Sequence, residues 1–80
     1  MPDEPASTLD LVLGAFRAAL GADLRPDDDF FEAGGDSVAA EAVLLHLEEA
    51  TGLALPGWTL LDNPTAARLV TLLDEGLSSG

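Results

Sequence analysis

The sequence has no cysteine, only one histidine and few basic residues. Without cysteine the chain forms neither a disulfide nor a thiolate zinc site, which agrees with a reducing, cytoplasmic setting. Three basic against fifteen acidic residues give a formal net charge of -12, and this charge repels nucleic acid and anionic membranes. We therefore expect either partners with basic patches or a charge that simply keeps a small, apolar-rich protein soluble.

Long apolar runs are also missing, and the start of the chain is acidic and proline-rich instead of basic and apolar. The sequence thus has neither a segment of membrane-spanning length nor the pattern of a signal peptide. A chain of 80 residues has room for one small domain. We predict a disordered lead-in at residues 1–6, a single monomeric domain at residues 7–77 and a frayed tail at residues 78–80.

Helical patterns bounded by capping residues make up most of what is present. A first helix is predicted to begin at Ser7, which forms a capping box with Asp10, and to end at Gly21. Its apolar residues recur with helical spacing and define one face. These residues are Leu9, Val12, Leu13, Phe16 and Leu20.

A second helix is predicted from residue 37 or 38 to about residue 51, where Gly52 stops it. It carries two apolar stripes, of which one consists of Val43, Leu47 and Ala50 and the other of Val38, Ala42 and Leu45. One stripe should face the core, while the other is either exposed or buried in a central helix. Glu48 and Glu49 oppose the helix dipole by a few tenths of a kcal/mol each. Because local stability does not explain these two residues, we interpret them as part of a partner-steering surface.

The last third of the sequence predicts two more helices. Residues 53–57 form a linker, and Trp58, which we expect to be partly buried, opens a helix that reaches about Leu61. Asn63 and Pro64 provide a cap and a first residue for the last helix. Its apolar residues are Ala66, Leu69, Val70 and Leu73, and Gly76 is its predicted end. Three substantial helices, one short helix and no strand predict an all-α, four-helix bundle.

Between the first two helices, residues 22–36 form a loop that is long for so small a domain. Phe30 and Phe31 are expected to be buried anchors that keep this loop ordered. Gly34 and Gly35 then allow a sharp turn. Ser37 follows at the start of a helix, where it should be exposed. A serine in this position is commonly only an N-cap, so a purely structural role stays open beside a functional one.

The segment from Asp29 to Val38 points to one family more specifically than a serine at a helix start does. Asp29-x-Phe31 followed by Gly34-Gly35-Asp36-Ser37-Val38 resembles the carrier proteins of nonribosomal peptide and polyketide synthesis, a family of peptidyl and acyl carriers. The Asn63-Pro64-Thr65 segment is similar to the start of the last helix in these carriers. The double glycine makes the motif closer to peptidyl than to fatty-acid carriers. Asp36, Val38 and Thr51 depart from the residues that are commonest at these positions in peptidyl carriers. The strong acidity of the chain is closer to the fatty-acid carriers.

The resemblance implies a covalent cofactor, 4′-phosphopantetheine on Ser37, with Gly35 and Asp36 as its neighbours in the motif. A phosphopantetheinyl transferase would attach this group, and an adenylation or acyltransferase enzyme would load an aminoacyl or acyl cargo onto it as a thioester. Condensation, thioesterase or tailoring enzymes would then act on the cargo in trans, with this chain as a free-standing carrier. Val38, Glu41 and Leu45 would contact these partners.

The sequence supplies no catalytic constellation and no metal site of its own. His46 lies nine residues after Ser37 on the same helix, on the order of 13 Å away, which is too far for a base that activates the serine. The acidic run at residues 27–29 lacks the spacing of a calcium loop. We therefore predict a carrier and not an enzyme. The alternative is a small acidic helical adaptor in which Ser37 is only a helix cap.

Overall fold

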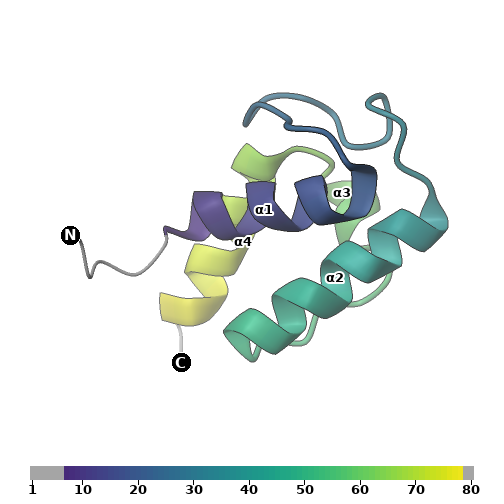
Figure 1. Cartoon of the computed structure of the whole chain (residues 1–80). Coiled ribbons are helices and arrows are strands. Elements are labelled where there is room, and N and C mark those ends of the chain that lie inside the picture. Colours follow the sequence, from purple (N-terminus) through teal and green to yellow (C-terminus); the bar gives the residue numbers. More distant parts are fainter. Residues whose placement is uncertain (1–6, 79–80) are drawn as a thin grey trace.

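A computed structural model describes residues 7–78, and these residues form four helices. They are α1 (Thr8–Leu20), α2 (Ser37–Thr51), α3 (Thr59–Asp62) and α4 (Ala66–Ser78). In Figure 1, α1 lies against both α2 and α4, and the loop that follows α1 folds over one end of the bundle. The described residues include no strand, so the predicted all-α bundle is confirmed. The predicted lead-in at residues 1–6 and the last two residues lie outside the described part.

One apolar core joins all four helices. Phe16 of α1 and Phe30 of the loop are fully buried, with ring centroids 4.9 Å apart. Such an aromatic pair contributes about 0.5–1.5 kcal/mol beyond the area that it buries. The remaining buried side chains of the core are Val12, Ala15, Leu24, Ala40, Val43, Leu44, Leu47, Leu55, Leu60, Ala66, Leu69 and Leu73. Phe30 therefore connects the long loop to the centre of the bundle.

The ends of α1 are those that the sequence predicts. The Ser7 hydroxyl accepts a hydrogen bond from the Asp10 N–H at 3.1 Å, as an N-cap does. At the other end Gly21 adopts φ 71°, and its N–H donates to the Arg17 carbonyl at 2.7 Å. This left-handed residue satisfies a carbonyl of the last turn. The helix is thus limited by signals that are local in sequence.

The linker after α2 changes the interpretation of one acidic residue. Glu48 Oε2 accepts a hydrogen bond from the N–H of Leu55, a buried residue, at 2.6 Å. Leu53 and Leu55 of this linker pack against the core, whereas Ala50, predicted to be a core residue, is exposed. The assignment of Glu48 to a partner surface was wrong, because its carboxylate holds the returning chain. Glu49 is exposed and remains available to solvent.

Trp58 is mostly exposed, contrary to the prediction of a partly buried packing residue. It has 59% of its surface accessible, because Thr59 and Leu60 take the buried positions of α3. The indole borders an apolar groove of about 290 Å³ between the linker and α4. Leu53, Pro56 and Leu72 are among the other residues of that groove.

The junction between α3 and α4 differs from the predicted cap. Asn63 closes α3 instead of opening α4, since its backbone N–H and its Nδ2 both donate to the Thr59 carbonyl at 3.0 Å. The residue that opens α4 is Thr65. Its Oγ1 accepts from the Arg68 N–H at 3.3 Å, and its carbonyl accepts from the Leu69 N–H at 3.0 Å. Residues 63–65 separate the two helices, and Asn63 and Thr65 each satisfy the terminal hydrogen bonds of one of them.

Gly76 does not end α4, which continues to Ser78. The glycine instead allows close packing, since a Cβ added there would lie 2.9 Å from Leu53 Cδ1. The prediction was wrong because it treated the glycine as a C-cap, whereas the linker after α2 requires a residue without a side chain at this place. Ser78, expected in the frayed tail, is the last residue of the helix.

Candidate functional site

The loop between α1 and α2 is ordered by hydrogen bonds to the start of α4. The Phe30 N–H donates to the Pro64 carbonyl at 2.8 Å, and the Ala67 N–H donates to the Pro26 carbonyl at 3.0 Å. Asp29 and Thr65 form an isolated bridge at the same place. Two segments far apart in the sequence therefore hold the loop that precedes Ser37.

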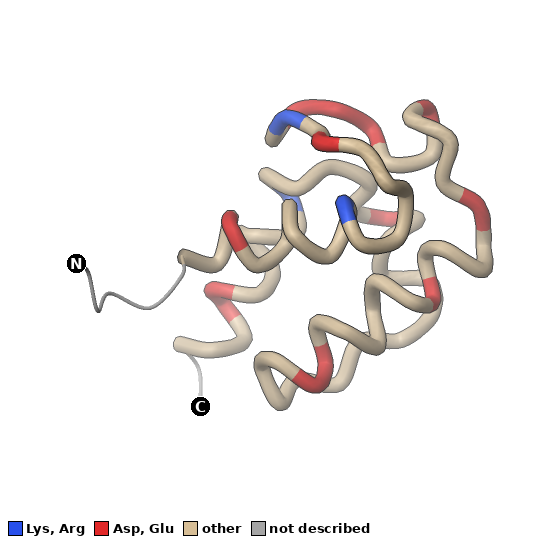
Figure 2. The backbone as a smooth tube through the Cα atoms, in the orientation of Figure 1, with Lys and Arg blue, Asp and Glu red and all other residues tan. Residues whose placement is uncertain are grey.

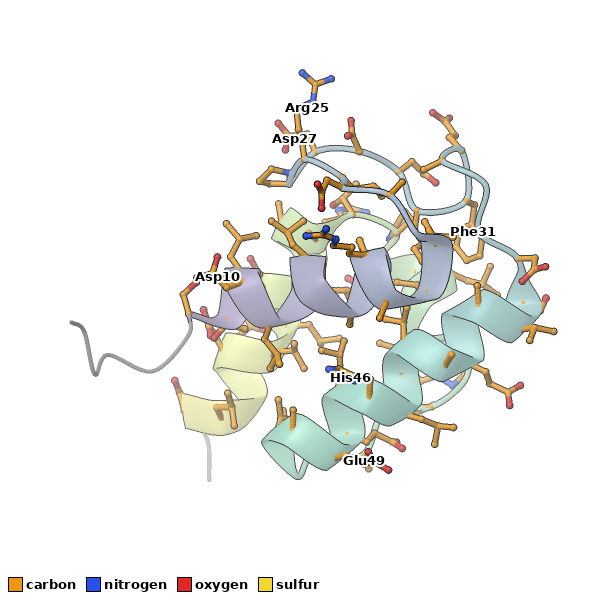
Figure 3. The ribbon with its side chains drawn as sticks, viewed as in Figure 1. Asp10, Arg25, Asp27, Phe31, His46 and Glu49 are labelled. Atoms are coloured by element: carbon orange, nitrogen blue, oxygen red, sulfur yellow. The ribbon has the colours of Figure 1, made fainter. Side chains whose placement is uncertain are left out.

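Asp29 shapes the turn that carries the two phenylalanines. Its Oδ1 accepts from the N–H groups of Phe31 and Glu32, at 2.8 and 3.1 Å. Phe30 is thereby directed into the core, while Phe31 is partly buried and meets Phe30 edge to face, with centroids 5.3 Å apart. Figure 3 shows Phe31 where the loop returns to α2, with Arg25 at the outer edge of the loop. The predicted anchors are confirmed, Phe30 fully and Phe31 in part.

The two glycines before the helix serve different purposes. Gly34 has φ 111°, a conformation that residues with a side chain rarely adopt. Gly35 does not have positive φ, but a Cβ there would overlap the Phe30 ring and lie 2.8 Å from the Phe30 carbonyl oxygen. The Gly35 N–H donates to that oxygen at 3.0 Å. The pair thus turns the chain and brings it tightly over the buried anchor.

Asp36, and not Ser37, is the N-cap of α2. Its Oδ1 accepts from the Ala39 N–H at 2.8 Å, and its carbonyl accepts from the Ala40 N–H at 2.9 Å. Ser37 is exposed, and its hydroxyl has no hydrogen-bond partner among residues 7–78. The predicted exposure of the serine is confirmed. The alternative in which Ser37 is the helix cap was wrong, because the carboxylate of Asp36, one residue earlier, holds that place.

The apolar residues of α2 that the core does not use are exposed along the helix that begins with this serine. Val38 is 78% exposed and Leu45 56% exposed, and Ala42 and Glu41 are exposed as well. Val43 and Leu47 of the other stripe are fully inside the core. The sequence left open whether the stripe of Val38, Ala42 and Leu45 is exposed or buried, and the structure shows that it is exposed.

A small pocket lies directly beside Ser37, and sequence reasoning missed its far wall. The pocket has a volume of about 110 Å³ and is bordered by Phe31, Ser37, Ala40 and Glu41 on one side and by Gly57 and Leu61 on the other. Gly57 belongs to the linker and Leu61 to α3, and neither has a sequence pattern that points toward the serine. Only the tertiary fold brings these two residues together with Ser37.

Acidic residues surround the site, but the described residues do not gather them into a metal cluster. Figure 2 shows them spread over the loop between α1 and α2 and along α2. No group of three or more potential ligands capable of holding a metal ion occurs in residues 7–78. Within the same residues no helix is long and apolar enough to cross a membrane. His46 is exposed on α2, well beyond the first turn that carries Ser37 (Figure 3).

Residues 10–73 match the family described as phosphopantetheine attachment site. The chain belongs to this family of carrier domains. It is 41% identical over 54 residues, 68% of the chain, to an erythronolide synthase from Saccharopolyspora erythraea. Over 44 residues, 55% of the chain, it is 46% identical to a linear gramicidin synthase from Brevibacillus parabrevis. A beauvericin nonribosomal cyclodepsipeptide synthetase from Gibberella fujikuroi is 30% identical over 76 residues, 94% of the chain.

The carrier domain is a small part of each of these relatives, since the chain spans 2%, 1% and 2% of their lengths. The family match implies a 4′-phosphopantetheine group attached covalently to a serine. The residues of the site fit this group. An exposed hydroxyl without a partner lies at a helix start, and the N–H groups of Ser37 and Val38 have no acceptor among the described residues.

Proposed function

We propose that Ser37 is the residue that carries 4′-phosphopantetheine and that the protein presents an aminoacyl or acyl group in natural-product biosynthesis. One observation carries this assignment: the sequence has serines at positions 7, 37, 78 and 79, and only Ser37 lies within the matched residues 10–73. Ser7 is also engaged as the cap of α1. The free hydroxyl of Ser37 supports the same choice.

Attachment requires only that the serine be reached by a transferase. The Ser37 Oγ forms a bond to the phosphorus of the phosphopantetheinyl group, the pyrophosphate bond of coenzyme A breaks, and 3′,5′-ADP leaves. The hydroxyl proton goes to a base of the transferase, because His46 lies nine residues along the helix, on the order of 13 Å away. When bound, the prosthetic group supplies a thiol on a flexible arm, and this thiol holds the cargo as a thioester.

The helix start is suited to a phosphodiester. The free N–H groups and the positive end of the α2 dipole favour negative charge there, by about 0.3–1 kcal/mol at an exposed site. Asp36 already places a carboxylate at the same end of the helix. We therefore expect the phosphodiester to stay solvated and the arm to remain mobile, as a carrier that visits several enzymes requires.

Partner enzymes are proposed to dock on the exposed face beside the serine. Val38 and Leu45 offer apolar contact, Glu41 lies between them on α2, and the net charge of -12 favours a basic docking surface. The partners would be a phosphopantetheinyl transferase, an adenylation or acyltransferase enzyme for loading, and condensation, thioesterase or tailoring enzymes. The protein itself would not catalyse these steps. That the protein is a separate, monomeric, cytoplasmic chain that binds these enzymes in trans remains a prediction.

Intact mass spectrometry tests the proposal. The purified protein is incubated with coenzyme A, Mg²⁺ and a broad-specificity phosphopantetheinyl transferase, and the product is mapped by peptide digestion. We expect one phosphopantetheine increment on the peptide that contains Ser37. The Ser37→Ala variant should show no increment and keep the helical circular dichroism spectrum, while Ser78→Ala, the matched control, should be modified as fully as the wild type. A folded wild-type protein that gains no mass, or gains it on another peptide, would contradict the assignment.

A further inference from the structure

A second hollow adjoins the attachment segment on the side of α1. It lies between the last turn of α1 and the first turns of α2 and has a volume of about 530 Å³, within the range of about 300–1,000 Å³ that binding clefts typically have. Its border consists of residues 18–20 of α1, Gly34, Asp36 and residues 38, 39 and 42. Figure 1 shows the end of α1 and the start of α2 at the same side of the bundle. We refer to this hollow as the α1–α2 groove.

The α1–α2 groove is open because alanines stand where longer side chains would fill it. Ala19 and Ala39 are partly buried and pack against the core. Ala18 and Ala42 are exposed, so the packing of the bundle does not require a small residue at either position. Leucine is nearly as good a helix former as alanine, so it would suit both helices. Core packing therefore does not explain why the groove is left open at these two exposed positions.

The groove is almost uncharged, in a chain of net charge -12. Among the described residues on its border Asp36 is the only charged one, and its Oδ1 already accepts from the Ala39 N–H at 2.8 Å. Val38 borders the groove with 78% of its surface exposed. An aliphatic side chain so exposed gains from contact with an apolar group, because both are removed from water. The chemistry of the groove thus fits an uncharged, apolar side chain of a partner protein.

The place of the groove favours one partner among those that the carrier meets. Asp36 and Val38, both on its border, are the chain neighbours of Ser37. A phosphopantetheinyl transferase must bring a base within about 3 Å of Ser37 Oγ to take its proton, so its surface has to cover both neighbours. Enzymes that act on the cargo meet it at the far end of a flexible arm and need not approach the serine so closely. The groove is therefore continuous with the surface that the transferase covers.

We propose that the α1–α2 groove is a docking site for the phosphopantetheinyl transferase and receives an apolar side chain of that enzyme. The inference rests on the proposed attachment at Ser37. It extends the interface from α2 to α1, a helix to which the sequence assigns no partner contact. The inserted side chain leaves water when the complex forms and thereby contributes to binding. Because this contact is the same before and during the transfer, its loss should raise KM and leave kcat nearly unchanged.

Variants that fill the groove test the proposal. Modification by a broad-specificity phosphopantetheinyl transferase is followed by intact mass at several carrier concentrations, for the wild type, Ala18→Leu and Ala42→Leu. We expect kcat/KM to fall about tenfold in each variant, which corresponds to about 1.4 kcal/mol, with the change in KM. The unfolding midpoint should change little, since both positions are exposed. The two variants lie on different helices, so either one decides the matter if the other fails to fold.

Two further variants are the controls. Ala50→Leu is matched to Ala42→Leu, because Ala50 is an exposed alanine in the last turn of the same helix and does not border the groove. It should be modified at the wild-type rate. Ala18→Ser changes the residue without filling the space, and it should keep most of the wild-type kcat/KM.

The outcome for this inference is separate from that for the attachment site. Unchanged kcat/KM in folded Ala18→Leu and Ala42→Leu, with the wild type modified on Ser37, would overturn the groove proposal alone. Faster modification of these two variants would also overturn it, because leucine would then add contact on a surface into which nothing inserts. An equal fall in Ala50→Leu would overturn it as well. Absence of any mass increment in the wild type would instead contradict the proposed function.

Discussion

The backbone of Gly35 lies against the ring of Phe30, and the Gly35 N–H donates to the Phe30 carbonyl at 3.0 Å. Phe30 is fully buried, and its ring centroid lies 4.9 Å from that of Phe16 of α1. The position of Ser37, two residues after Gly35, is therefore fixed to the core and not only to its own helix. An exposed residue gains a defined position in this way without being buried itself.

A Gly35→Ala variant should lose stability because an added Cβ overlaps the Phe30 ring. Overpacking of a filled core typically costs about 1–3 kcal/mol. Urea unfolding followed by circular dichroism would measure the loss, with Gly14→Ala as control. That control places alanine in an exposed helix position and should be neutral or stabilising by up to about 1 kcal/mol. Equal unfolding midpoints for Gly35→Ala and wild type would show that the contact with Phe30 is not tight.

Replacing Asp36 should destabilise α2, whereas replacing Ser37 should not. Asp36→Ala removes the acceptor of the Ala39 N–H and should cost about 0.5–2 kcal/mol in urea unfolding. Asp36→Asn keeps an oxygen for the same bond and should retain most of the stability. Ser37→Ala removes an exposed hydroxyl without a described partner and should change the free energy of unfolding by less than about 0.5 kcal/mol. If Ser37→Ala lost more free energy of unfolding than Asp36→Ala, Ser37 and not Asp36 would be the N-cap of α2.

Two adjacent glutamates should respond differently to the same change. Glu48→Ala leaves the Leu55 N–H without its acceptor and should cost about 1–3 kcal/mol. Glu49→Ala changes an exposed side chain and should stay within about 0.5 kcal/mol of the wild type. Trp58, three residues after Leu55, reports on the same linker, so a fluorescence change is expected in the first variant alone. If both variants lost similar free energy of unfolding, the negative charge and not the hydrogen bond to Leu55 would be the source of the stabilisation.

The features that sequence predicted correctly depend on neighbours along the chain. Ser7 and Gly21 limit α1, and Gly52 limits α2, because capping needs only the residues of one turn. The motif around Ser37 identifies the family for the same reason, since its residues are contiguous. Helical spacing likewise found all the buried residues of α4, but only Val43 and Leu47 of the four buried residues of α2.

The features that sequence missed depend on contacts between distant segments. Glu48 was interpreted as a surface residue because nothing nearby in sequence indicates that Leu55 returns to it. Gly76 was interpreted as a helix end, although it makes room for Leu53. The Gly57 side of the serine pocket was not found, because a glycine in a linker has no periodic pattern. Such contacts require the arrangement of the helices, which local patterns do not give.

The charge near the serine should affect the rate of partner association more than stability. Glu41→Gln removes an exposed negative charge on the proposed docking face and should slow association with a basic loading enzyme. The effect should shrink as salt is raised, since the screening length falls from about 10 Å at 0.1 M to about 3 Å at 1 M. Stopped-flow association at several salt concentrations measures this. The matched control is Glu75→Gln on α4, which should have a smaller effect, and equal effects would indicate that only net charge matters.

The exposed apolar residues of α2 should matter for loading and not for folding. Val38→Ser and Leu45→Ser replace side chains that are already 78% and 56% exposed, so the unfolding midpoint should change little. If either side chain enters a partner, its loss costs more than about 1 kcal/mol of binding, and each 1.4 kcal/mol lowers kcat/KM for loading by about tenfold. Leu77→Ser is the matched control, because Leu77 is an exposed leucine in the last turn of α4, on a different helix from Ser37. If all three variants were loaded at the wild-type rate, the partners would have to dock on another face of the bundle.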